Sequence, residues 1–475
     1  MKARLLCLAA AAACLSVAVC AGPVTVSANS AQTHWQGVDA SGAVVQGGDC
    51  PVEVGHETLT FNLGEFPSNY YERAEDFLAY GGSVSAEYTF YNPADYAVSV
   101  ALAFPFGLLP SYGYMYSEEE ELLYSQLPSR FGVTVNGEAV SCAVRHTYYP
   151  EYSQFSVESD IPRLRDGLDG DGLFLPGTEV KLYTFEAYGV DDKTYPSACA
   201  AFDISPEEPC GVVCDDIRGT AYDGGKYRIK TGAGNGDTFE VYMIGAHARP
   251  QLTFYRDGGC GNGTEIEGSA RLLTETSLSF EEFALAQWSE DSGISRTDYY
   301  NAYADKLASS LVNDEVAVCN ERALRPGELM RWYEYELDFA PGETLVNRVE
   351  APIYPEIDMG YKPALHTYTY LLSPASTWKS FGSLDVIINT PFYVIGGEGF
   401  TETENGYAKS FDGLPEGELV FSLASSPEVE GPSPFGGFGS FLAMFGVPIR
   451  LALFVITGVV IVAALLLYRS KNRKK

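Results

Sequence analysis

Basic residues and histidine are scarce in this 475-residue sequence. It has 31 lysines and arginines against 63 aspartates and glutamates, and five histidines, so its formal net charge is −32. A chain of this charge repels the phosphates of nucleic acids and anionic membrane surfaces. We therefore exclude nucleic acid as a partner. We expect the acidic surface to keep an exposed domain soluble and to attract cations or basic partners.

Recognisable catalytic and nucleotide-binding motifs are also lacking. The glycine-rich segment 232–236 has neither the spacing of a dinucleotide site nor the lysine of a P-loop. Segments 376–379 and 230–232 match two serine β-lactamase motifs, but in reversed order along the chain. A histidine-based nucleophile site would need a histidine beside a serine or cysteine in the fold, which the sequence alone does not show. We predict no catalytic residue and no cofactor-binding residue.

Long apolar runs occur only near the two ends. Lys2 and Arg4 precede an apolar stretch that ends in small residues, which predicts a signal peptide over 1–28. The alternatives are an uncleaved membrane helix and a lipid-modified Cys20. Residues 451–468 contain no charge, and five basic residues follow them. A helix of this length spans about 27 Å, close to the apolar thickness of a bilayer.

We therefore predict a transmembrane helix over 449–468 and a basic cytoplasmic tail over 469–475. A linker rich in proline, glycine and phenylalanine, 428–448, precedes the helix. Together these segments predict a single-pass protein of the plasma membrane, held there by its own helix, with its N-terminal part outside the cell.

Seven cysteines follow the predicted signal peptide. Four of them, Cys199, Cys210, Cys214 and Cys260, fall within one stretch of 62 residues and lack the CxxC spacing of a zinc site. Export permits disulfides, so we expect one or two among these four. Buried thiols and a metal site are the alternatives. The odd total leaves at least one thiol free or paired between chains.

Most of the chain between the two ends is predicted to be β. Short stretches of alternating apolar and polar residues are separated by turn residues about every ten positions. The buried face changes phase at Gly55, and Asn136-Gly137 predicts a type I′ hairpin. We predict two β-sandwich-like regions, over 29–190 and 324–427, with a cysteine-containing β region over 191–275 between them.

Helices are few in the predicted fold. Three serines are each followed three positions later by an acidic residue, as at helix N-caps: Ser117, Ser279 and Ser295. After the last of these, Tyr299, Tyr303, Leu307 and Leu311 recur every four residues and predict a packed helix face. We predict that 276–323 is a short helical connector between the β regions.

One candidate site is an acidic loop. Asp166, Asp169 and Asp171 alternate with glycines and offer the hard oxygen ligands that Ca²⁺ prefers, although their spacing is not that of an EF-hand. Ca²⁺ is thus the one cofactor that we carry as a hypothesis. The alternative is an ordinary acidic turn.

A second candidate is a tyrosine-rich segment. Tyr112, Tyr114 and Tyr116 alternate, so in an extended segment they would share one face. Tyrosine combines an apolar ring with a polar tip and suits contact with proteins or sugars. The alternative is ordinary strand packing.

Three further stretches carry a resemblance: EYTFYNPADYAVSVALAFPFG (87–107), RWYEYELDFAPGE (331–343) and YLLSPASTWKSFGSLDVIINTPFY (370–393). Together they resemble a group of membrane-anchored extracellular proteins of Gram-positive bacteria, across most of the predicted exterior part. The resemblance implies location and a β-rich fold, and it brings no activity and no site residue. We expect a non-catalytic surface protein for recognition, adhesion or envelope structure, with an unknown protein or glycan ligand. The alternative is an extracellular hydrolase that acts on glycans with paired carboxylates.

Overall fold

The computed structural model describes residues 26–28, 30–38, 44–45, 50–107, 117–149, 155–170, 172–205, 209–223, 225–232, 234–261 and 263–431. It is mainly β, with 46% strand and 15% helix, which confirms the predicted class. Among these residues no helix is both long and apolar enough to cross a membrane. The predicted transmembrane helix and tail, and the signal peptide up to residue 25, lie outside the described residues.

The chain divides into two compact units, one of 1–355, 368–391 and 399–420, the other of 356–367, 392–398 and 421–475.

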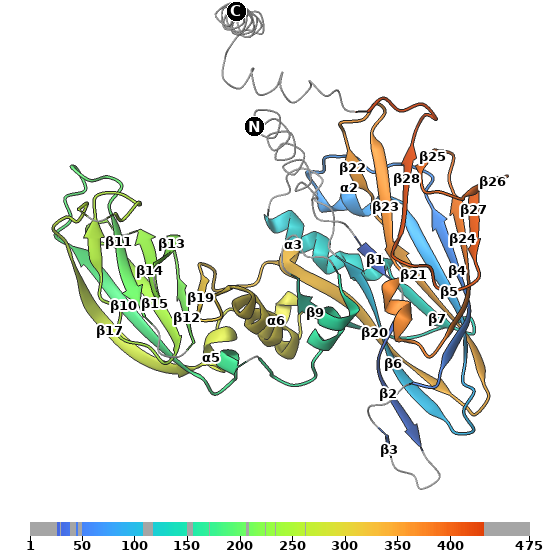
Figure 1. Cartoon of the computed structure of the whole chain (residues 1–475), viewed down its shortest axis with the longest axis horizontal. Helices are drawn as coiled ribbons and strands as arrows, with labels where there is room; N and C mark the ends of the chain where they lie inside the picture. Colours follow the sequence, from blue (N-terminus) through green and yellow to red (C-terminus); the bar gives the residue numbers. More distant parts are fainter. Residues whose placement is uncertain are drawn as a thin grey trace, which may run out of the picture. The chain divides into compact units, whose positions relative to one another are not determined.

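The first unit contains an eight-stranded sheet (Figure 1). Its strands, in spatial order, are β26 (Thr401–Thr403), β27 (Gly406–Phe411), β24 (Phe381–Asn389), β4 (Glu53–Asn62), β5 (Ser83–Tyr91), β21 (Thr344–Pro352), β7 (Gly132–Val135) and β8 (Glu138–Ala139). Strands β4 and β24 run parallel. Alternate residues such as Leu59 and Phe61 are fully buried, because successive side chains of a strand point to opposite faces.

A five-stranded sheet belongs to the same unit. Its order is β3 (Val44–Val45), β2 (Ala31–Val38), β6 (Val98–Gly107), β20 (Leu329–Phe339) and β9 (Ala143–Tyr148). It packs on the eight-stranded sheet: the rings of Phe339 and Phe90 meet edge to face with centroids 6.3 Å apart. The Tyr335 hydroxyl also donates to Asn347 Oδ1 at 2.8 Å.

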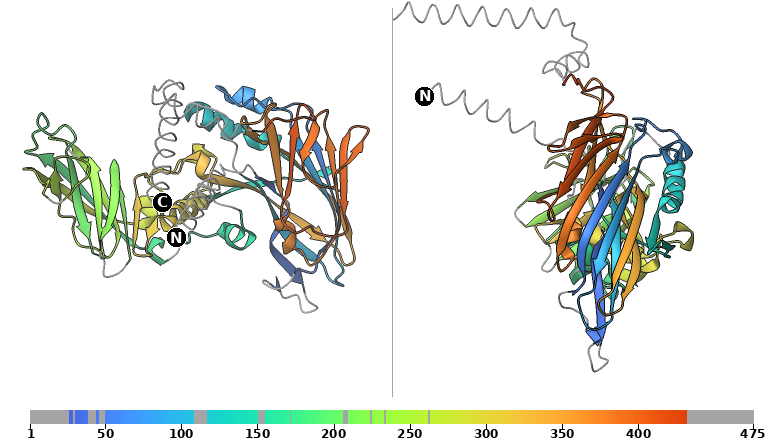
Figure 2. Two further views of the ribbon diagram at one scale, coloured as in Figure 1. Left: turned by 45° about the horizontal axis from the view of Figure 1, so that its top comes forward. Right: turned by 90° about the vertical axis from the view of Figure 1, so that its right-hand side faces the viewer.

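Both sheets combine strands from the two ends of the chain. Strands β4 and β5 pair with β24 and β21, and β6 pairs with β20, as Figure 2 shows for the blue and orange strands. The observed pairing therefore differs from the predicted boundaries, which placed 29–190 and 324–427 in separate sandwiches. Alternation identifies a strand and its buried face, but it does not identify the partner of that strand.

Residues 149–328 are inserted between the neighbouring strands β9 and β20, and they contain a sandwich of their own. We call it the inserted sandwich. Its six-stranded sheet has the order β17 (Ser269–Ser279), β10 (Glu179–Tyr188), β15 (Thr238–Gly245), β12 (Cys210–Cys214), β19 (Val316–Cys319) and β18 (Leu311–Val312). The four-stranded sheet has the order β13 (Ile217–Asp223), β14 (Lys226–Gly232), β11 (Cys199–Ile204) and β16 (Thr253–Tyr255). Phe202, Ile229 and Val241 fill the core between the sheets. The predicted boundary at 190 falls within this sandwich.

Two helices, α5 (Phe280–Ala284) and α6 (Arg296–Ser309), cover the other face of the six-stranded sheet. Tyr300 and Tyr303 of α6 pack in one cluster with Tyr242 and Ile244 of β15. The predicted connector 276–323 is therefore part of the inserted sandwich, and it supplies a second core.

The remaining helical segments within the described residues are short. They are α2 (Ala74–Leu78), α3 (Ser117–Gln126), η1 (Leu127–Arg130), α4 (Val157–Asp160), η2 (Ile161–Arg163), η3 (Gly172–Phe174), η4 (Glu290–Ser292), η5 (Pro326–Glu328) and η6 (Ser373–Thr377).

A fifth sheet contains β1 (Val26–Ala28), β22 (Glu356–Asp358), β23 (Leu365–Leu371), β25 (Tyr393–Gly396) and β28 (Leu419–Ala424). In the first unit, β1 runs parallel to residues 369–371 of β23. In the second unit, β22 pairs with residues 365–367 and β25 pairs with residues 422–424.

Candidate functional site

The outer face of the eight-stranded sheet presents one polar residue from each of six neighbouring strands. The backbone register aligns them across the sheet in the order Ser410, Asp385, Thr58, Glu87, Arg348 and Thr134. We call these residues the polar row. None of them is buried. With strands about 4.8 Å apart, the row is about 24 Å long.

A hollow of about 420 Å³ opens at one end of the polar row. Glu87, Thr134 and Arg348 line it together with Gly132, Gly137, Val346 and Glu350. Arg348 is hydrogen-bonded to Glu350, and Val346 is exposed although it is apolar. The hollow therefore offers both signs of charge and one apolar contact.

His56 lies beside the other end of the row. Its Nδ1 is 2.8 Å from Ser383 Oγ, and its Nε2 is 3.1 Å from Thr58 Oγ1 and 3.5 Å from Asp385 Oδ2. Ser410 Oγ donates to the other carboxylate oxygen of Asp385 at 2.5 Å. The fold thus brings a histidine beside a serine that is 327 positions away in the sequence.

Ser383, His56 and Asp385 are the residue types of a serine hydrolase site. In such a site the carboxylate orients the imidazole. Here His56 Nε2 lies nearer to Thr58 Oγ1, at 3.1 Å, than to Asp385 Oδ2, at 3.5 Å. We therefore assign Ser383 and His56 to hydrogen bonding.

A β-bulge at Gly55 brings His56 to this face. The register with β5 shifts between Val54 and His56, so the buried positions change from Val54 to Glu57 and Leu59. The change at Gly55 in which alternate positions are apolar was the one signal in the sequence for this β-bulge. Nothing in the sequence indicated that Ser383 and Asp385 would be the neighbours.

A second hollow, of about 520 Å³, lies on the inserted sandwich and is lined by four carboxylates. Arg322 pairs with two of them, Glu240 at 2.9 Å and Asp215 at 3.6 Å. Asp216 pairs with Arg218, and Asp237 accepts a hydrogen bond from the Gly234 amide. Each carboxylate thus has a partner within the chain, which makes this hollow the weaker candidate.

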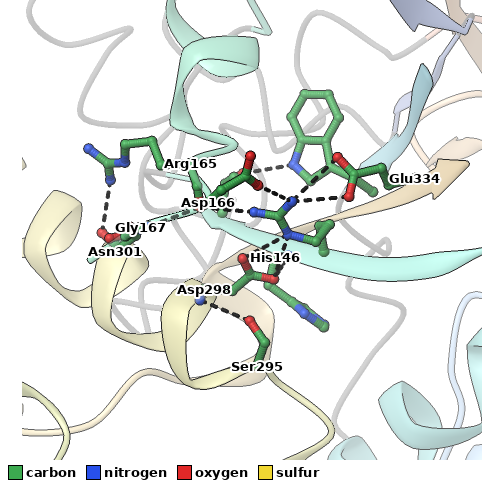
Figure 3. A network of polar contacts seen from close by, with 11 residues as sticks. His146, Arg165, Asp166, Gly167, Ser295, Asp298, Asn301 and Glu334 are labelled. Atoms are coloured by element: carbon green, nitrogen blue, oxygen red, sulfur yellow. Dashed lines mark hydrogen bonds and ion pairs between the residues drawn. The ribbon is translucent and has the colours of Figure 1, made fainter. Parts of the chain in front are cut away.

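Figure 3 shows where part of the predicted calcium site lies. The Asp166 carboxylate is 88% exposed and lies 3.3 Å from Nη1 of Arg145. Asp169 Oδ1 accepts a hydrogen bond from the Gly170 amide, and Asp171 lies outside the described residues. In the part of the chain that the structure describes, no three His, Cys, Asp or Glu side chains are placed to hold a metal ion. The calcium site stays a prediction.

The same figure shows Asp166, Asp298 and Glu334 in one polar network. The Arg145 side chain pairs with all three carboxylates. Its Nε lies 3.0 Å from Asp298 Oδ1, and its Nη1 lies 3.1 Å from Glu334 Oε2. Asp298 Oδ2 accepts a hydrogen bond from the His146 amide at 3.0 Å. Burial raises the pKa of Asp298, while Arg145 opposes that rise. The network joins β9 and β20 to α6, and we assign it a structural role.

The other predicted positions are placed as follows. Tyr112, Tyr114 and Tyr116 lie outside the described residues, so the tyrosine face stays a prediction. Cys199, Cys210, Cys214 and Cys260 are all buried thiols in the structure, and burial is the main cause that raises the pKa of the first three.

No protein-family model and no curated protein sequence matches the chain. Among solved structures, the fold is similar to a crystal structure described as a "putative nutrient binding protein" from Legionella pneumophila subsp. pneumophila. The two chains are 11% identical with a TM-score of 0.30, over 84% of this chain and 72% of the other. A likeness at this level carries no argument about function.

Proposed function

We propose that the protein is a single-pass surface protein of the plasma membrane whose exterior part recognises a glycan through the polar row. The transmembrane helix over 449–468, with the chain before it outside the cell, is part of this proposal and rests on the sequence. The observation that carries the recognition role is the alignment of six unburied polar side chains across six adjacent strands.

The chemistry of the polar row suits sugar hydroxyl groups. The three hydroxyl side chains, Ser410, Thr58 and Thr134, can both donate and accept hydrogen bonds, the two carboxylates accept, and Arg348 donates. A rigid sheet holds these groups at a fixed spacing, which lowers the entropy cost of binding. The row is long enough to contact several sugars of an extended chain, and the hollow at Arg348 has a volume of about 420 Å³ for a side branch.

Binding of the purified full-length chain to an array of envelope and host glycans tests the proposal. Arg348→Met should weaken binding about 10- to 100-fold, because it removes charge-assisted hydrogen bonds. Arg271→Met is the matched control, since Arg271 is 63% exposed on the inserted sandwich and pairs with Glu186. Unchanged binding by the Arg348 variant, or no binding to any glycan, would contradict the proposal.

The location has its own test. Protease added to intact cells should digest the exterior part and leave a fragment that contains 449–475 in the membrane fraction. Protection of the whole chain from the protease would refute an exterior location.

A second candidate function is glycan hydrolysis by Asp385 and Glu87. These residues flank Thr58 in the polar row, so their backbones are two strand spacings, about 10 Å, apart. The carboxyl groups of inverting glycosidases lie roughly 6.5–9.5 Å apart. If the protein is such an enzyme, Asp385→Asn and Glu87→Gln should each abolish release of reducing ends even at glycan concentrations that saturate binding. Absence of hydrolysis by the unmodified protein on every glycan that it binds would remove this candidate.

A further inference from the structure

We propose that Cys199 and Cys260 form a disulfide bond in the exported protein, and that Cys210 and Cys214 stay thiols. This inference concerns the inserted sandwich; it rests on the proposed export of the chain and is independent of the glycan proposal. The sequence left the pairing of the four cysteines open, and the structure separates them into one adjacent pair and two isolated positions.

The two sulfur atoms share a single hydrogen-bond acceptor. Cys199 Sγ donates to the carbonyl oxygen of Asp257 at 3.2 Å, and Cys260 Sγ donates to the same oxygen at 3.8 Å. Both residues belong to one small buried cluster with Ala201 and Tyr255. Burial is the first cause that raises the pKa of Cys199, to about 12, and the neighbouring Cys260 thiol is the second, which agrees with the shared acceptor and the shared cluster.

The other two cysteines are unsuited to this bond. Cys210 and Cys214 begin and end the same extended strand, so their Cα atoms are about 13 Å apart, beyond the roughly 7 Å limit for a disulfide. Cys214 Sγ contacts Asp215 O and Thr231 Oγ1, and Cys210 lies in the core between the two sheets. Cys210 and Cys214 therefore lie in surroundings that are separate from those of the Cys199–Cys260 pair.

The backbone at Cys260 indicates that its sulfur has a role. Cys260 adopts φ of +49°, in the left-handed region, which costs about 1 kcal/mol or more for a residue with a Cβ. Its sequence neighbours Gly259 and Gly261 are glycines, the residue that adopts such a conformation without strain. A cysteine in the strained position of a glycine-rich loop points to a requirement for its side chain.

Two basic side chains hold this loop against the four-stranded sheet. Arg228 Nη1 donates to Cys260 O at 3.2 Å, and Lys230 Nζ donates to Gly259 O at 3.1 Å. Both come from β14, the neighbour of β11 that carries Cys199. The loop is therefore placed for the bond before the bond forms, which lowers the strain of closure.

The chemistry is thiol–disulfide exchange with an external disulfide, either of an oxidoreductase outside the membrane or of a small-molecule oxidant. One protein thiolate attacks a sulfur of the external disulfide, and a mixed disulfide forms as one external thiol leaves. The second protein thiolate then attacks the protein sulfur of the mixed disulfide and displaces the other external thiol. The protein loses two electrons, the external disulfide gains them, and the two protons end on the released thiols. Because both sulfurs are buried in the folded chain, we expect exchange while the exported chain folds.

Peptide mapping of the exported full-length protein tests the pairing. The unreduced protein is alkylated and then cleaved with trypsin and an Asp-N protease, because Asp203 lies between Cys199 and Cys210 and separates them. We expect one linked peptide pair that contains Cys199 and Cys260, and complete alkylation of Cys210 and Cys214 after denaturation. A link from Cys199 or Cys260 to another cysteine would overturn the proposal. Full alkylation of both, even after incubation with oxidised glutathione, would also overturn it.

Cysteine variants distinguish the effect of the disulfide bond on stability from the effect of the residues around it. Reductant should lower the melting temperature of the inserted sandwich by roughly 5–10 °C, because the bond closes a loop of 62 residues. Cys260→Ala should remove this response to reductant, and Cys210→Ser should keep both the response and the linked peptide. If Cys260→Ala fails to fold, the linked peptide of the Cys210 variant remains the deciding result. An equal response to reductant in the unmodified protein and in Cys260→Ala would contradict the proposal.

Discussion

Arg145 of β9 and Asp298 of α6 form a largely buried ion pair across 153 positions of sequence, with Nε 3.0 Å from Oδ1. Their side chains are 12% and 3% exposed. Asp298→Ala would leave the guanidinium buried with fewer partners, so we expect the free energy of unfolding to fall by about 3–5 kcal/mol. Urea unfolding followed by tryptophan fluorescence measures this change.

The matched control is Arg271→Ala at the surface pair with Glu186, where we expect a loss below about 1 kcal/mol. Similar losses in the two variants would show that the Arg145 network does not hold α6 to β9.

The buried His146 makes the stability of the folded protein depend on pH. Burial and the charges of Arg331 and Arg145 lower its pKa from 6.5 to about 3. Between these values the unfolded chain binds a proton that the folded chain does not. The free energy of unfolding should therefore fall as pH falls from 6.5 toward 3, by up to about 1.4 kcal/mol per pH unit from this residue.

His146→Gln should flatten that slope in a series of urea unfolding curves. Burial also lowers the pKa of His366, to about 4, so His366→Gln should remove a smaller part of the slope. An unchanged slope in the His146 variant would mean that its imidazole is accessible to protons in the folded protein.

Tyr335 supports a hydrogen-bonded chain between the two large sheets. Its hydroxyl donates to Asn347 Oδ1 at 2.8 Å and lies 3.1 Å from Ser30 Oγ, and both partners are fully buried. Tyr335→Phe would deprive these buried groups of their partner, at a cost of about 1–3 kcal/mol in thermal or urea unfolding. Tyr188→Phe, at a tyrosine that is 50% exposed, should change stability little. Equal effects in both variants would argue against the hydrogen-bonded chain.

Gly382 is required where β24 meets β4. A Cβ at this position would lie 2.1 Å from the Gly55 oxygen, so Gly382→Ala must separate the parallel strands and should cost roughly 1–3 kcal/mol. At Gly132 nothing lies within 4 Å of such a Cβ, so Gly132→Ala is the control. Full stability of the Gly382 variant in urea unfolding would show that the two backbones are less close.

Local structure was predictable where one short segment determines it. Asn136 and Gly137 have φ of 50° and 85°, as the predicted hairpin turn requires. Ser279 and Glu282 form a capping box, and the Ser295 side chain accepts from the Asp298 amide. In the predicted stripe, Tyr299, Tyr303 and Leu307 of α6 are buried, whereas Leu311 lies in β18 and is only partly buried. Tyr300 was missed, and its hydroxyl donates to Phe174 O of a distant segment.

The strand partners and the candidate site could not be predicted in this way. The polar row draws one residue from each of six strands, and each residue by itself is an ordinary surface side chain. Its existence depends on register between strands such as β4 and β24, which no local pattern specifies. The pairing of β9 with β20 could not be predicted for a similar reason. The inserted sandwich separates these two strands in sequence, although they are neighbours in the sheet.

The parallel pairing of β4 with β24 also affects the order in which the chain folds. At about 5–20 residues synthesised per second, β4 waits on the order of half a minute for its partner, some 320 positions later. Until then the backbone groups along that edge of β4 are open to wrong partners. The inserted sandwich is complete earlier in synthesis, because its strands lie closer together in sequence. We therefore expect the N-terminal strands to be the part of the nascent chain that chaperones bind.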